Sequence, residues 1–333
     1  MKITKKHFLL TVFFLSVFSQ VNGEKPRHEI LREESKSVLE RSLRIAEQFY
    51  SLEGELKEIT AAILESEETR KEIKQLVRST GRRFFLFNYP SDGFLVKGYI
   101  SFLPDSEKNS LLIFLRGGNG LLGLMHPATD FTCAHNYTVI ATTYRGGVSE
   151  GKDEFGGAEV SDVHNLLEYF PIIQEKIGVY FSPQKTFVLG ASRGGMEMFL
   201  ALNRSISVQS KVTKAVSLSG RLDLQECMVY REDMRKMFIR DFGLEPEKNE
   251  AAWIAYRNPI TNISSIRSDL PVFILQGTKD LRVSLNDGLH MANALENNGN
   301  SVTYLEVQGG DHCLANQPDR MSIITNWLEN ESF

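Results

Sequence analysis

The chain has 333 residues, a length that allows one large α/β domain or two ordinary ones. Its 38 basic and 42 acidic residues give a formal charge of −4, which lacks the basic excess of a nucleic-acid-binding protein. Three scattered cysteines do not make a disulfide framework or a zinc site, and the sequence contains no nucleotide-binding motif. We therefore expect no nucleic acid, cofactor or metal as a partner.

Residues 1–23 have the layout of a secretory signal peptide. A start with three lysines precedes a largely apolar run from Phe8 to Phe18, and small or apolar residues occupy the −3 and −1 positions of a cut after Gly23. This run is well short of the roughly 20 residues that cross a bilayer, and no later segment is a better candidate. We expect cleavage after Gly23 and a secreted or periplasmic protein without a membrane span in its mature part.

Residues 24–80 are predicted to be a helical segment. Charged residues are frequent there, and apolar residues recur at helical spacing, with one apolar stripe and one charged face. The stripe includes Leu31, Val38, Phe49, Leu56 and Ile63. We expect this segment to pack as a layer on the main domain. A lid over an active site, or a hairpin that binds a partner, is the alternative.

Residues 81–333 alternate between short β-type runs and helical segments. Alternation of this kind indicates crossover connections and a mostly parallel sheet flanked by helices. The first runs are joined by turns too short for a crossover, so the first edge of the sheet should be antiparallel. The predicted strands are 83–89, 94–102, 111–115, 137–142, 186–190, 215–219, 272–276 and 302–307, and the main predicted helices are 160–170, 194–203, 286–297 and 320–328, with short helices between 224 and 256.

The strongest chemical signal is Gly190-Ala-Ser192-Arg-Gly194, which lies between a predicted strand and a predicted helix. It fits the nucleophile elbow G-x-S-x-G, in which a strained turn exposes a serine at the carboxyl end of a sheet. Glycines flank the serine because neighbouring backbone approaches too closely for side chains. The sequence therefore predicts Ser192 as a nucleophile.

A nucleophilic serine needs a base and a third group that orients the base. In sheets of this type the residues follow in the order serine, acid, histidine. His312 follows the last predicted strand in a loop of small residues, and we predict it as the base. Asp280, three residues after Gly277, ends the preceding strand and is the predicted acid. Asp311 is the alternative acid, although it would have to fold back onto its direct neighbour.

Together these motifs resemble the catalytic domain of the prolyl-oligopeptidase-type serine peptidases, within the α/β-hydrolase superfamily. The resemblance runs from about Tyr89 to the C-terminus, and it implies an α/β-hydrolase fold over residues 81–333. It also implies Ser192, Asp280 and His312 as nucleophile, acid and base. The segments that carry the resemblance include Arg116-Gly-Gly118, Tyr144-Arg-Gly-Gly, Asn258-Pro-Ile and Gly277-Thr-Lys-Asp280.

The chain departs from this family in two ways. Larger members place a β-propeller before the catalytic domain, where this chain has only residues 24–80. Many members also have a tyrosine before the Gly-Gly of the oxyanion loop, where this chain has Arg116. We expect the oxyanion donors to be the amide of Arg193 and an amide of the loop that contains Arg116, Gly117 and Gly118. The Arg116 side chain should either pair with a carboxylate, and so hold the loop, or reach the site.

The function predicted from the sequence is an exported serine hydrolase that splits acyl bonds through an acyl-enzyme. The resemblance favours a peptide substrate, and a small carboxylic ester is the alternative. A less favoured alternative is an inactive hydrolase-fold protein that binds a partner through residues 24–80. The intact set of three catalytic residue types argues against it, and fold alone does not decide the substrate.

Overall fold

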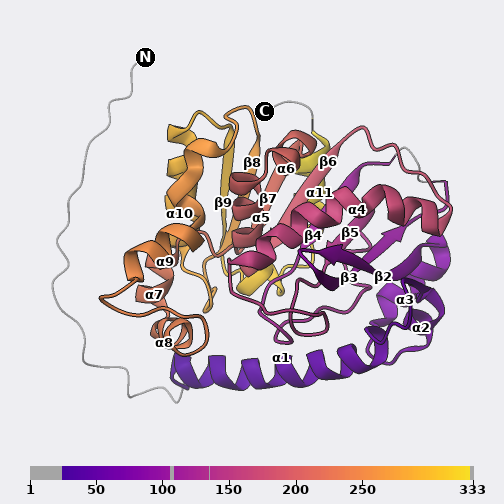
Figure 1. Cartoon of the computed structure of the whole chain (residues 1–333), viewed down its shortest axis with the longest axis horizontal. Helices are drawn as coiled ribbons and strands as arrows, with labels where there is room; N and C mark the ends of the chain where they lie inside the picture. Colours follow the sequence, from indigo (N-terminus) through magenta and orange to yellow (C-terminus); the bar gives the residue numbers. More distant parts are fainter. Residues whose placement is uncertain (1–24, 106–108, 135, 331–333) are drawn as a thin grey trace.

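The computed structural model describes residues 25–105, 109–134 and 136–330, so the predicted signal peptide lies outside the described residues. Nine strands form one mixed sheet in the order β1-β2-β3-β5-β4-β6-β7-β8-β9 (Figure 1). The strands from β5 to β9 in this order pair in parallel, and the β1, β2 and β3 edge is antiparallel, which confirms the predicted arrangement. The strands are β1 (Leu56–Glu58), β2 (Arg83–Ser91), β3 (Phe94–Phe102), β4 (Leu111–Leu115), β5 (Thr138–Thr142), β6 (Thr186–Ala191), β7 (Lys214–Leu218), β8 (Val272–Gly277) and β9 (Val302–Val307).

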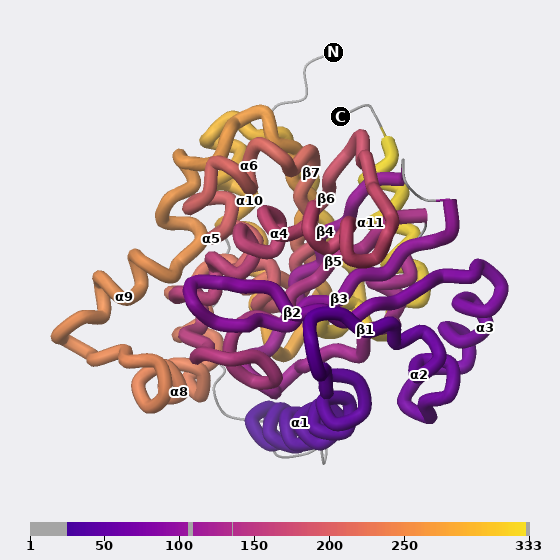
Figure 2. The backbone as a smooth tube through the Cα atoms, turned by 45° about the vertical axis from the view of Figure 1, so that its right-hand side comes forward, coloured from indigo at the N-terminus to yellow at the C-terminus, as the bar shows by residue number. Residues whose placement is uncertain are grey.

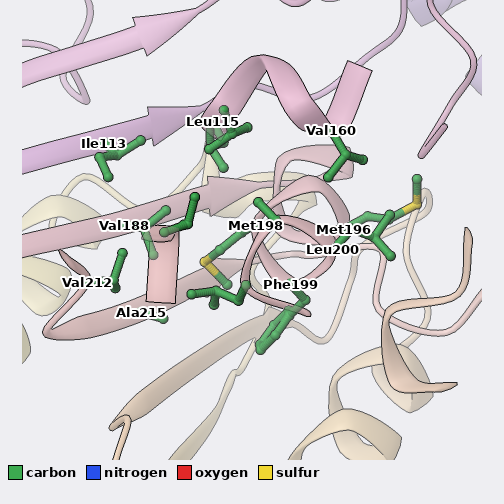
Figure 3. Close-up of a cluster of buried hydrophobic side chains, with 14 of the residues drawn as sticks. Ile113, Leu115, Val160, Val188, Met196, Met198, Phe199, Leu200, Val212 and Ala215 are labelled. Carbon is green, nitrogen blue, oxygen red and sulfur yellow. The ribbon is translucent and has the colours of Figure 1, made fainter. Parts of the chain in front are cut away.

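Helices cover both faces of the sheet because the central strands are apolar on both sides. In β4, Ile113 and Leu115 belong to one buried cluster, whereas Leu112 and Phe114 belong to a second one on the opposite face. Figure 3 shows part of the first cluster, which joins Ile113 and Leu115 of β4 with side chains of the helix that follows β6. The helices are α1 (Arg27–Phe49), α2 (Thr60–Glu65), α3 (Lys71–Thr80), α4 (Ser161–Ile177), α5 (Arg193–Arg204), α6 (Ile206–Lys211), α7 (Leu224–Tyr230), α8 (Glu232–Asp241), α9 (Glu250–Arg257), α10 (Leu285–Asn297) and α11 (Arg320–Glu329), with short 3-10 turns at η1 (Ala158–Val160), η2 (Pro259–Ser265) and η3 (His312–Leu314).

Residues 25–80 contain three helices, their connections and one short strand, so the expectation of helix is wrong at Leu56–Glu58. Helix α1 ends at Phe49, Gly54 has a φ of 84° in the connection that follows, and the chain then adds β1 to the edge of β2, with Leu56 opposite Phe87. An edge strand presents unpaired backbone groups, and β1 pairs with those of Phe85–Phe87 in β2. Helical spacing in the sequence does not reveal this because Leu56 is apolar in either structure.

The C-terminal end of α1 and the helices α2 and α3 pack on one face of the sheet. Phe49, Ile63 and Val77 are at most 2% exposed and belong to the buried cluster on one face. Over its length α1 runs along one end of the molecule, from below α8 to α2 and α3 in Figure 1, and Figure 2 shows it at the same end. Among the described residues, no helix combines the length and the apolar character needed to cross a bilayer.

The parallel strands bring the predicted functional loops to one edge of the sheet. Strands β4, β6, β8 and β9 run in the same direction, and their carboxyl ends lead into the loops that contain Arg116, Ser192, Asp280 and His312. In open α/β sheets such an edge is the usual place for a ligand site.

Candidate active site

The turn between β6 and α5 holds Ser192 in a strained conformation. Ser192 has φ 57° and ψ −124°, a region that non-glycine residues seldom occupy. The glycines around it are required by space: a Cβ on Gly190 would lie 2.3 Å from the carbonyl oxygen of Gly194, and one on Gly194 would lie 1.9 Å from that of Leu115. The predicted elbow is therefore present, with the serine at the start of a helix.

Ser192, His312 and Asp280 form a continuous hydrogen-bonded chain. The Oγ of Ser192 lies 3.0 Å from Nε2 of His312, and Nδ1 of His312 lies 2.8 Å from Oδ2 of Asp280. The other carboxylate oxygen of Asp280 accepts hydrogen bonds from the amides of Arg282 and Val283, at 2.7 and 3.0 Å. These contacts fix the buried carboxylate against the imidazole.

The alternative acid, Asp311, has a different partner. Its Oδ1 accepts a hydrogen bond from the amide of Asn316 at 3.0 Å, and this bond closes the loop that follows β9. The structure thus places Asp280 on the histidine and gives Asp311 a role in the shape of the loop.

The electrostatic environment favours charge separation between the acid and the base. Burial by itself raises the pKa of Asp280, but the hydrogen bond and charge of His312, with the two amides, hold that pKa below its ordinary value. Burial lowers the pKa of His312, but Cys313 and the carboxylate of Asp280 outweigh burial and raise it above its usual value. The imidazole is therefore a stronger base than a free histidine, with its proton held on the side of Asp280.

Arg116 braces the loop after β4 from within. Its guanidinium is buried and donates to the carbonyl oxygens of Gly117 at 2.9 Å, Gly120 at 2.8 Å and Thr143 at 2.8 Å. Within the described residues, the hydrogen bonds of the Arg116 side chain go to carbonyl groups. The expectation that Arg116 pairs with a carboxylate is therefore wrong. The reason is that the loop folds around the guanidinium, which brings three of its own or neighbouring carbonyl groups within reach.

Gly117 places backbone directly against the serine. A Cβ at this position would lie 2.8 Å from the Cβ of Ser192 and 3.3 Å from its Oγ. The neighbouring Gly118 has a φ of 71°, and a Cβ there would lie 1.9 Å from the carbonyl oxygen of Leu122. Both glycines are thus needed for the loop to approach the site. The amide of Arg193 belongs to the first residue of α5, where helix amides are free to bind an anion.

The side chain of Arg193 joins the elbow to this loop through a buried cluster of charges. Its guanidinium contacts Asp153 at 2.7 Å, Glu159 at 2.5 Å and Glu197 at 2.9 Å, and it donates to the carbonyl oxygen of Gly118 at 2.9 Å. Burial raises the pKa of Glu197 to about 8, although the charge of Arg193 opposes this shift. Sequence reasoning predicted only the amide of Arg193, and the spacing of four residues to Glu197 was the one available signal of the cluster.

Comparison with known proteins gives a consistent result. A model described as "Prolyl oligopeptidase family" matches residues 127–332, more than half of the chain. The chain is 25% identical over 254 residues to "Uncharacterized peptidase YtmA" of Bacillus subtilis, a match that covers 74% of this chain and 94% of that protein. It is also 25% identical over 191 residues to the acylamino-acid-releasing enzyme of Arabidopsis thaliana, covering 54% of this chain and 24% of that enzyme.

A solved structure supports the same fold. The acylaminoacyl peptidase of Pyrococcus horikoshii superposes with a TM-score of 0.61 at 17% identity, over 74% of this chain and 42% of that one. This chain therefore spans less than half of the length of that enzyme and about a quarter of the Arabidopsis enzyme. At this identity the likeness to the solved structure shows the α/β-hydrolase fold.

Proposed function

This chain belongs to the prolyl oligopeptidase family and is a serine hydrolase, and from that premise we propose that Ser192, His312 and Asp280 are its catalytic triad. The observation that carries the proposal is the unbroken hydrogen-bonded chain from Oγ of Ser192 through His312 to Oδ2 of Asp280. Three residues from three separate loops meet in the order and at the distances that nucleophilic catalysis requires.

In this mechanism His312 is the general base. Its Nε2 takes the proton of the Ser192 hydroxyl while Oγ attacks the carbonyl carbon of the substrate. The tetrahedral intermediate collapses to an acyl-enzyme when the protonated His312 gives its proton to the leaving group, and water then repeats the sequence to release the acid. Asp280 keeps the other imidazole proton on Nδ1 and stabilises the cation that forms.

The oxyanion is stabilised by backbone amides. The amide of Arg193 at the start of α5 and an amide of Gly117 or Gly118 are the donors we propose, since both segments lie against Ser192. The Arg116 guanidinium supports this site indirectly because its bonds to carbonyl groups hold the loop in place. One such donor contributes roughly 10²- to 10³-fold to kcat in enzymes of this type.

We propose peptide bonds as the substrate, and small carboxylic esters as the second candidate on the same triad. The names of the relatives, peptidase and acylamino-acid-releasing enzyme, support the first. An amide is the harder substrate because its amine must be protonated as it leaves, and the raised pKa of His312 suits that step.

A paired assay tests this choice. N-acetyl-aminoacyl nitroanilides and the nitrophenyl esters of the same acyl groups are compared, with Ser192→Ala as the control for background hydrolysis. We expect the wild-type protein to cleave both series. Ester turnover without any amide cleavage would replace the peptidase by an esterase.

We also propose that the protein is exported and that residues 1–23 are removed. The support is the sequence pattern alone, since these residues lie outside the described part of the chain. Expression of the full chain in a secreting host, followed by mass determination of the product, should give an N-terminus at residue 24. An intact Met1 on protein that stays in the cell would contradict this proposal.

A further inference from the structure

One face of helix α1 is directed at the domain, and this face is buried at both ends of the helix but not in its middle. Residues 31, 38 and 45 are spaced by seven, about two helical turns, so they share that face. Leu31 and Ile45 are 5% and 2% exposed, whereas Val38 is 38% exposed. The helix therefore crosses an open space near Val38.

Both ends of this helix are attached to the domain. Near its start, Arg27 donates to the carbonyl oxygens of Leu281, at 3.0 and 2.6 Å, and of Tyr230, at 3.0 Å, and its guanidinium lies 3.8 Å from the centre of the Tyr230 ring. Directly after the helix, the hydroxyl of Tyr50 donates to the carbonyl oxygen of Met125 at 2.8 Å. Helix α1 is thus a fixed bridge across this end of the molecule, as its position in Figure 1 illustrates.

The space under the bridge is a cavity beside the proposed base. Its volume of about 420 Å³ is within the range of ligand pockets in proteins. One wall belongs to α1, and the opposite wall belongs to the loops that follow β8 and β9, which also carry two members of the proposed triad. The lining residues are Glu34, Ser37 and Val38 on the helix, and Lys279, Leu281, Arg282, Asp311 and His312 on the loops.

The two walls combine charged side chains, Lys279 and Asp311 among them, with two accessible apolar side chains that face the same space. Glu34 and Arg282 form an ion pair at 2.8 Å that ties the helix to the acid loop and neutralises both charges. Val38 and Leu281 offer apolar surface from the two walls, and each is more than one third exposed although it lines a cavity. Accessible apolar surface in a concave site next to a base is suited to hold an apolar group of a ligand.

We propose that α1 forms one wall of a substrate-binding subsite and that Val38, opposite Leu281, limits the size of the apolar side chain accepted there from a short peptide substrate. This inference rests on the proposed function of the triad. The wall formed by α1 lies outside residues 127–332, the part of the chain that the family model matches.

The test fills the subsite from the helix side. Val38→Trp adds bulk inside the cavity, and Glu40→Trp is the matched control because it adds the same side chain about 200° around the helix. Substrates are acetylated peptides in which one residue on either side of the scissile bond is in turn alanine, leucine or phenylalanine. Nitrophenyl acetate, which is too small to need the subsite, reports the triad alone.

We expect Val38→Trp to lower kcat/KM for the leucine and phenylalanine substrates at one position by roughly 10- to 200-fold, mainly through KM. Nitrophenyl acetate turnover and the Glu40→Trp variant should stay at wild-type values, and Val38→Ala should improve the use of phenylalanine relative to alanine. An unchanged preference in both Val38 variants would overturn the inference, as would an equal loss on nitrophenyl acetate. Loss of all turnover in Ser192→Ala would still support the triad in either case, so the two failures are distinguishable.

Discussion

Replacement of Arg193 by methionine removes the cation from a buried group of three carboxylates. The side chains of Asp153, Glu159 and Glu197 are 7%, 0% and 0% exposed, and each lies within 2.9 Å of the guanidinium. Methionine keeps much of the apolar stem but leaves these carboxylates without their partner. Removal of one partner from a buried ion pair typically costs about 3–5 kcal/mol of unfolding free energy.

This cost should be visible as a large change in Tm. For a domain of this size each kcal/mol lowers Tm by about 2–4 °C, so the Arg193→Met variant should melt roughly 6–20 °C below the wild type. Glu197→Gln should change Tm little, because burial has raised the pKa of Glu197 to about 8 and its carboxyl group is mostly protonated at neutral pH.

The loss of stability in Arg193→Met should also depend on pH. Without the cation, burial raises the folded-state pKa values of the remaining carboxyl groups above their unfolded values. A group of this kind stabilises the fold below its unfolded pKa, and that stabilisation is lost as the pH rises through the folded pKa. The difference in Tm between the variant and the wild type should therefore be smallest near pH 5 and largest near pH 8.

Thermal unfolding followed by circular dichroism between pH 5 and pH 8 provides the measurement. Arg240→Met is the control, since Arg240 pairs with Asp241 on the exposed surface, where such a pair contributes little. A variant of Arg193 that melts like the wild type at pH 7.5, or a difference that grows towards acid pH, would refute the reasoning from buried charge.

Three further outcomes follow from the site and the helical segment. Gly117→Ala places a Cβ 2.8 Å from that of Ser192, so kcat should fall by about 100-fold while Tm changes little, and normal kcat would contradict the tight approach. Because a protonated imidazole cannot accept a proton, the raised pKa of His312 should put the acid limb of the kcat/KM profile above pH 6.5. Asp280→Asn should move this limb to lower pH and reduce kcat by about 10⁴-fold. A limb that does not move in this variant would count against Asp280 as the acid. Deletion of residues 24–80 uncovers the sheet face under Phe49 and Ile63 and should give aggregates in size-exclusion chromatography, whereas a soluble monomer with wild-type Tm would show that the segment is not a packed layer.

The fold class could be predicted because it follows from the order of short strand and helix patterns along the sequence. Apolar strands such as Leu111–Leu115 alternate with helices, and the parallel order follows from connections long enough to cross over. The same logic located Ser192, Asp280 and His312, since each follows a strand and the carboxyl ends of parallel strands meet at one edge. These are properties of short segments and of chain order.

The features that the sequence did not predict depend on contacts between residues far apart in the chain, and the spacing of residue types along the sequence does not encode such contacts. The strand at Leu56–Glu58 exists because β2 offers a free edge, and the guanidinium of Arg116 binds carbonyl groups because the loop closes around it. The exposure of Val38 is of the same kind: its spacing from Leu31 and Ile45 is that of a buried residue, but in the structure it lines the cavity under α1 and is 38% exposed.

The central claim is that Ser192 is an activated nucleophile, and covalent labelling tests it most directly. A fluorophosphonate probe should modify the folded wild-type protein at one site, which peptide mass spectrometry should identify as Ser192. Ser192→Ala should not be labelled, and its turnover should fall by about 10⁶ if the triad acts as a unit. Equal labelling of Ser192→Ala, or a folded wild-type protein that does not react, would contradict the account.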